Sequence, residues 1–96
     1  MHVLAVTVDA AHQLAQHYLK AGDTAGARWA VQQAWTADPD HIDDAPWVDL
    51  IEADQIDGNR AAMHQLRDDL VAFRGYEVPE DLPPATFQAI EDLFRR

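Results

Sequence analysis

The segment from Leu14 to Pro39, LAQHYLKAGDTAGARWAVQQAWTADP, constrains the fold of this chain more than any other stretch. Apolar residues recur in it at steps of three and four, the period of a helix with one buried face. The pattern is interrupted at Gly22-Asp23, where glycine suits the end of one helix and aspartate the cap of the next. Pro39 ends the pattern because proline cannot continue a helix. The segment therefore predicts a helical hairpin.

The same punctuation returns 36 residues later, where Gly58-Asn59 aligns with Gly22-Asp23. A helix-turn-helix unit repeated at this spacing is typical of an α-solenoid, in which each hairpin buries its apolar face on the next. A final apolar helix follows Pro83-Pro84, which suit a first helical turn. The sequence therefore predicts a single all-α domain over residues 1–96. It would contain two hairpins and a C-terminal capping helix, with helices at about 3–21, 24–37, 45–56, 60–73 and 84–95.

Two expectations concern the large apolar side chains. Trp29 and Trp35 lie about 240° apart around the second helix, so they cannot face the same neighbour. We favour the interpretation that two different helices cover them, with exposure of one tryptophan as the alternative. In the connector after the fourth helix, Tyr76 and Val78 are expected to pack against the helices and hold the connector in place.

Composition excludes several classes of protein. The chain has a formal net charge of −10, and nucleic-acid affinity depends largely on Lys and Arg that neutralise phosphates. Direct nucleic-acid binding is therefore not expected. There is no cysteine, which excludes disulfides and thiol chemistry. No apolar run approaches the ~20 residues of a membrane span, and the N-terminal stretch is a poor signal peptide. We expect a cytoplasmic location.

The sequence offers no convincing catalytic, metal or cofactor site. His12 and His17 lie five positions apart on one helix, roughly 140° around its axis, so they diverge instead of converging on an ion. His41 lies in an acidic stretch, DPDHIDD, which lacks the ligand spacing and the glycine of an EF-hand loop. We interpret this stretch as a solvated acidic loop that caps the third helix. No hydroxyl residue has an evident base and orienting group. The sequence therefore predicts a non-enzyme without cofactor.

The first hairpin resembles a tetratricopeptide repeat. In the first helix of the hairpin, Leu14, Ala15 and Tyr18 match the large-small-large face of such a repeat. The second helix and its end match at the positions Ala27, Val31, Ala34 and Pro39. The second hairpin keeps Trp47 and Leu50 at the first-helix positions. It departs from the repeat at Ile51, Asp54, Arg67 and Gly75. The resemblance implies a tetratricopeptide-like α-α superhelix whose second repeat has diverged.

The order of helices and connectors over roughly residues 8–95 also resembles the bacterial transcriptional activator domain. The most specific part is the connector Val78-Pro79 with Pro83-Pro84-x-Thr86 before the last helix. In that family such repeats follow a winged DNA-binding domain in antibiotic regulatory proteins, or occur in larger actinobacterial proteins, some with LysM modules. The resemblance implies a regulatory or interaction domain that is a fragment of a longer protein.

We therefore expect a protein-protein interaction domain that binds a partner protein or peptide, preferably basic, or a second copy of itself. The expected partner-binding residues are those placed along the first helices of the hairpins, with one tryptophan at the margin: His12, Gln16, Lys20, Trp29, Asp49 and Asp54. Two alternatives remain open. One is a regulatory domain that faces nucleic acid, and the other is a purely structural module of a LysM-containing envelope protein.

Overall fold

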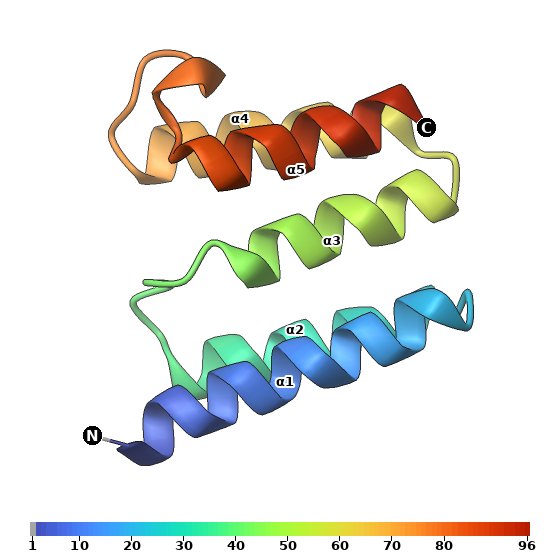
Figure 1. Cartoon of the computed structure of the whole chain (residues 1–96), viewed down its shortest axis with the longest axis vertical. Coiled ribbons are helices and arrows are strands. Elements are labelled where there is room, and N and C mark those ends of the chain that lie inside the picture. Colours follow the sequence, from blue (N-terminus) through green and yellow to red (C-terminus); the bar gives the residue numbers. More distant parts are fainter. Residues whose placement is uncertain (1) are drawn as a thin grey trace.

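The computed structural model describes residues 2–96, with side chains from residue 7 onward, and shows an all-α chain in that range (Figure 1). The predicted all-α class is confirmed for the described residues, with five α-helices and a short 3-10 turn at Pro79–Asp81. The helices are α1 (His2–Lys20), α2 (Thr24–Ala37), α3 (Ala45–Ile56), α4 (Arg60–Phe73) and α5 (Pro84–Arg95). These bounds agree with the sequence-based ones to within a residue.

The helices form two layers. In Figure 1, α1, α3 and α5 lie in front, and α2 and α4 lie behind them. Helix α3 packs against each of the other four helices, which makes it the centre of the fold. This position explains why its buried residues surround the helix instead of forming one stripe: Pro46, Trp47, Asp49, Ile51 and Ala53.

The two hairpin turns have the same backbone geometry. Gly22 and Gly58 have φ values of +74° and +75°, which glycine adopts without strain. The following residues cap the next helices: Asp23 accepts a hydrogen bond from the Gly26 N–H at 2.9 Å, and Asn59 accepts one from the Ala62 N–H at 3.1 Å. The predicted turns and caps are therefore confirmed, and they place each second helix behind its first.

The apolar core changes character along the chain. Between α1 and α2 the buried centre is formed by the small residues Ala15, Ala30 and Val31, with larger, partly buried side chains packed around them. Between α3, α4 and α5 it is built from large side chains, and its buried members are Trp47, Ile51, Met63, Leu70, Val71, Leu82, Ile90 and Leu93. Helix α5 therefore covers the large buried side chains of the second hairpin.

The connector between α4 and α5 differs from the prediction. Tyr76 and Val78 are 38% and 44% exposed, so the expectation that they pack against the helices is wrong. The side chain of Asp81 accepts hydrogen bonds from the Glu77 and Val78 N–H groups, which closes the connector on itself. Leu82, the residue after the 3-10 turn, is buried in their place.

The tryptophans settle the open question about α2. Trp35 packs against Trp47, with ring centroids 5.3 Å apart, whereas Trp29 is 54% exposed. The favoured interpretation, in which both tryptophans of α2 are covered, is therefore wrong, and the alternative holds. Across residues 2–96, the helices are all too short or too polar to cross a membrane.

Candidate functional site

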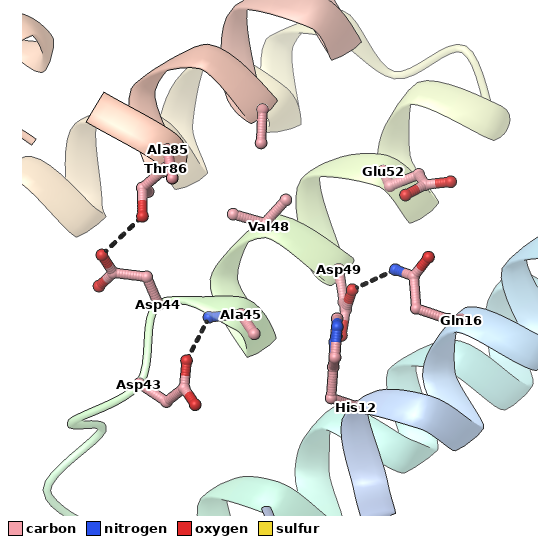
Figure 2. A pocket seen from close by; sticks show the side chains of 11 residues that line it. His12, Gln16, Asp43, Asp44, Ala45, Val48, Asp49, Glu52, Ala85 and Thr86 are labelled. Carbon is pink, nitrogen blue, oxygen red and sulfur yellow. Dashed lines mark hydrogen bonds and ion pairs between the residues drawn. The ribbon is translucent and has the colours of Figure 1, made fainter. Parts of the chain in front are cut away.

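A groove on the front layer is the candidate site. It lies between α1, α3 and α5 and has a volume of about 430 Å³. Figure 2 shows the side chains that line the groove, which come from these three helices and from the two residues just before α3. They are His12, Gln16, Asp43, Asp44, Ala45, Val48, Asp49, Glu52, Ala85, Thr86 and Ala89. The groove thus combines a small apolar floor with four carboxylates.

The carboxylate of Asp49 is the most unusual group in this groove, because it is only 1% exposed. Both of its oxygens are held by α1 (Figure 2): His12 Nδ1 lies 2.7 Å from Oδ2, and Gln16 Nε2 donates to Oδ1 at 2.6 Å. Donation to a carboxylate requires a proton on His12 Nδ1. The one-turn spacing of His12 and Gln16 places both donors on the same face of α1.

Burial raises the pKa of Asp49, while the hydrogen bonds from His12 and Gln16 oppose that shift. Burying a carboxylate destabilises a fold unless the charge is paired and hydrogen-bonded. Here both donors come from α1, so this charged group links the first hairpin to α3 of the second. It is an anchored negative group inside the groove.

The other end of the groove is formed where α3 begins. Asp43 Oδ1 accepts a hydrogen bond from the Ala45 N–H at 2.9 Å, which satisfies an amide of the first turn. Asp44 is bound from two sides: Arg74 reaches Oδ1 at 2.7 Å, and Thr86 Oγ1 donates to Oδ2 at 2.9 Å. Asp44 therefore fixes the start of α3 to α4 and α5.

Glu52 lies one turn beyond Asp49, and of the four carboxylates it makes the weakest internal contact. Its Oε2 is 3.7 Å from Arg96 Nη1, and its side chain is 20% exposed. An ion pair of this length at the surface contributes little to stability. The carboxylate of Glu52 is therefore free to meet a ligand without breaking a strong internal contact.

The structure brings together three of the six expected partner-binding residues, His12, Gln16 and Asp49. The other three lie elsewhere. Lys20 is exposed near the end of α1 and is absent from the groove lining, and Trp29 belongs to α2 in the back layer. Asp54 is turned to α2, where Arg28 Nη2 lies 2.7 Å from its Oδ1.

Arg28 forms a polar link between the hairpins on this opposite side. It also reaches Asp57 at 2.8 Å, and Asp57 accepts a hydrogen bond from Thr24 Oγ1 at 3.0 Å. The hydrogen bond from Arg28 lowers the pKa of Asp57, and the bond to Asp57 raises the pKa of Arg28. Asp54 and Asp57 thus serve to join the two hairpins.

Sequence reasoning missed Asp43, Asp44, Glu52 and Thr86 as groove residues. Asp43 and Asp44 could be identified as helix caps, but only the packing of α5 shows that the same carboxylates line a groove. Among the described residues, no group of three or more His, Asp or Glu side chains is arranged to hold a metal ion. The groove presents hydrogen-bond acceptors and an amide, which suits binding of cationic or donor groups.

Scans against models of known protein families and searches of curated proteins and of solved structures found no significant match to this chain.

Proposed function

We propose that this protein is a non-catalytic interaction domain of tetratricopeptide type, which binds a basic segment of a partner protein through the groove between α1, α3 and α5. The observation that carries this proposal is the anchored carboxylate of Asp49 in a groove lined by the first helices of the hairpins. Helical hairpins stacked in this way expose such a face for binding.

The charge of the groove supports a basic partner. Four of its lining residues are carboxylates, and no lining residue is Lys or Arg. Arg74 neutralises Asp44 from outside the lining, but no cation among the described side chains lies comparably close to Asp43 or Glu52. Complementary charge favours encounter with a positive segment and rejects an acidic one.

The regulatory setting rests on the sequence resemblance. The connector Val78-Pro79 and the Pro83-Pro84-x-Thr86 start of α5 are similar to the bacterial transcriptional activator domain. On this proposal the chain is the cytoplasmic regulatory portion of a longer actinobacterial transcriptional regulator. The partner would be another protein or another copy of the regulator, and DNA contact would occur elsewhere in that protein.

A peptide-binding experiment tests the groove. A display library of Lys- and Arg-containing peptides is selected on the chain, and the best binder is titrated by calorimetry. Glu52→Gln removes one partly buried carboxylate, and the effect on folding should be small because its ion pair with Arg96 is long. We expect about three- to tenfold weaker binding and a smaller salt dependence, since a peripheral charge contributes modestly to affinity.

Asp68→Asn is the matched control, because Asp68 is an exposed carboxylate on α4, outside the groove lining. Binding that is unchanged by Glu52→Gln, or weakened equally by Asp68→Asn, would contradict the groove proposal. A gel-shift titration at low salt gives a second check. Tight, salt-sensitive binding of DNA by the chain alone would favour the nucleic-acid-facing alternative.

A further inference from the structure

A second surface, separate from the groove, lies where the α2–α3 connector (residues 38–44) meets the end of α4 and the connector that follows it. Ile42 is 72% exposed and Phe73 is 51% exposed. Tyr76 and Val78 follow within five residues of Phe73. These four are among the six large apolar side chains that are exposed in the described part of the chain, and all four belong to the two connectors or to the last residue of α4.

Specific contacts hold Ile42 and Phe73 next to each other. Arg74 Nη2 donates a hydrogen bond to the Ile42 carbonyl oxygen at 3.1 Å, and its guanidinium lies 5.5 Å from the centre of the Phe73 ring. The His41 ring lies 5.5 Å from the same phenyl ring. Ile42 and Phe73 therefore form one surface patch, which we call the connector patch, although they are far apart in sequence.

Aromatic side chains pack against one another next to the connector patch. The imidazole of His41 stacks on Trp35 with ring centroids 4.4 Å apart, and Trp47 lies 5.7 Å from Phe73. His41 has a φ of +52°, a conformation that is uncommon for residues other than glycine. The His41 ring is thus covered by an aromatic contact, while the next residue, Ile42, is exposed to solvent.

Polar atoms beneath the connector patch also lack partners. Trp35 Nε1, Trp47 Nε1 and His41 Nδ1 are buried without a hydrogen bond to the protein. An unpaired buried polar group destabilises a fold, and sparsely populated backbone conformations cluster at active sites and ligand-binding segments. This end of the molecule therefore combines strain, unpaired nitrogens and exposed apolar side chains.

The surroundings of the connector patch are acidic. Five exposed carboxylates belong to the two connectors: Asp40, Asp43, Glu77, Glu80 and Asp81. The single Arg or Lys of these connectors is Arg74, whose guanidinium is already bound to Asp44 at 2.7 Å. An apolar patch with a negative rim suits a ligand that is apolar in its centre and positive at its edges.

We propose that the connector patch docks a basic amphipathic helix of a partner protein. Apolar side chains at helical spacing would cover Ile42 and Phe73, and Lys or Arg side chains would lie on the surrounding carboxylates. A second copy of this chain fits less well, because symmetric pairing would bring two acidic rims together. Ile42 and Phe73 lie outside the groove lining, and the two surfaces share only the exposed carboxylate of Asp43.

The test uses the whole chain and a synthetic helical peptide of about 14 residues, with Leu at the i, i+3, i+4 and i+7 positions and Lys at the others. One control peptide replaces Leu with Ser and keeps the charge, and another replaces Lys with Glu. Calorimetry should show the Leu-Lys peptide binding at least about tenfold more tightly than either control. Equal affinity for the Leu-Lys and Ser-Lys peptides would overturn the proposal, as would no measurable binding.

Ile42→Ser locates the binding site and leaves folding intact, because the side chain is mostly in solvent. We expect it to weaken binding of the Leu-Lys peptide about threefold or more, and Phe73→Ser to weaken it further. Ile56→Ser is the matched control, since Ile56 is also exposed but lies at the other end of α3. Glu52→Gln should leave this binding unchanged, which separates the patch from the groove.

Two results would refute the assignment. One is equal binding by the unmodified chain and Ile42→Ser. The other is self-association that sedimentation detects in the unmodified chain and that Ile42→Ser abolishes, which would make a second copy the occupant.

Discussion

The two hairpins use the same turn but different interiors. Positions 36 residues apart are equivalent, and at three of them a buried alanine of the first hairpin corresponds to a large residue of the second: Ala15 and Ile51, Ala27 and Met63, Ala34 and Leu70. All six side chains are almost fully buried. The turns, in contrast, share the positive-φ glycine and the Asx cap.

This difference shows that the turn and the interface are specified by separate parts of the sequence. Local backbone requirements keep glycine and an Asx residue at the turn, whatever the helices bury. The interior depends on what each hairpin meets. Small residues let α1 and α2 lie close together, whereas α3 and α4 use large residues to fill a space that α5 and Leu82 also border.

Gly26 shows at one position how the interior residues differ between the two hairpins. A Cβ atom at this position would come within 2.6 Å of the Tyr18 ring, so the absence of a side chain lets the aromatic ring pack closely. At the equivalent positions of the second hairpin, Ala62 and Asp54 replace Gly26 and Tyr18. The side chain that required the glycine is absent there, and alanine is accommodated.

The strongest test of the comparison is Leu70→Ala, which gives the second hairpin the residue of the first. Leu70 is fully buried among large side chains, so the substitution leaves a cavity. We expect the free energy of unfolding to fall by about 2–5 kcal/mol. Urea unfolding measures this loss. A loss below about 1 kcal/mol would mean that the core around α5 collapses to fill the space.

Ala27→Leu makes the opposite exchange in the first hairpin. Ala27 is 1% exposed and packs in one cluster with Leu19 and Ala53, so a larger side chain overfills the interface. We expect a destabilisation of about 1–3 kcal/mol, seen as a lower melting temperature. Met63→Leu at the equivalent position conserves volume and should cost less than about 1.5 kcal/mol. An unchanged melting temperature for Ala27→Leu would show that the first interface is not closely packed.

The smallest expected effect concerns the shared turn. Gly22→Val and Gly58→Val should each destabilise the protein by about 1–2 kcal/mol, because a side chain disfavours positive φ. A Cβ at either position meets no atom within 4 Å, so the first carbon of the new side chain causes no clash with neighbouring residues. Thermal unfolding should give similar losses for both. A neutral result at one turn would show that the two hairpins do not share a common turn requirement.

The sequence predicted the helices well because glycine, proline and capping residues act locally. Gly22, Asp23, Gly58 and Asn59 specify turn geometry whatever the tertiary context. The prediction failed at Tyr76 and Val78, where apolar character alone did not show which residue the connector would turn inward. Leu82 follows the 3-10 turn, in which its N–H donates to the Pro79 carbonyl, and the Asp81 side chain accepts hydrogen bonds from the residues before the turn.

The site was less predictable, because it depends on contacts between residues far apart in sequence. His12 and Gln16 were predicted as partner-binding residues from their place on the first helix, but the burial of Asp49 between α1 and α3 follows only from the packing of the hairpins. Asp54 has the same type of side chain and turns to Arg28 instead. The exposure of Trp29 and the stacking of His41 on Trp35 likewise require three-dimensional information.

The three tryptophans lie in different environments and can therefore serve as intrinsic spectroscopic probes. Trp29 is about half exposed to solvent, whereas the ring centroids of Trp35 and Trp47 lie 5.3 Å apart with an angle of 63° between the ring planes. Two indoles this close couple their electronic transitions, so they should produce a near-ultraviolet circular dichroism signal that depends on the contact between α2 and α3. The emission of Trp29 should be that of a water-exposed indole. Docking of the two hairpins and exposure of the α2 surface can thus be followed separately, without attaching a dye.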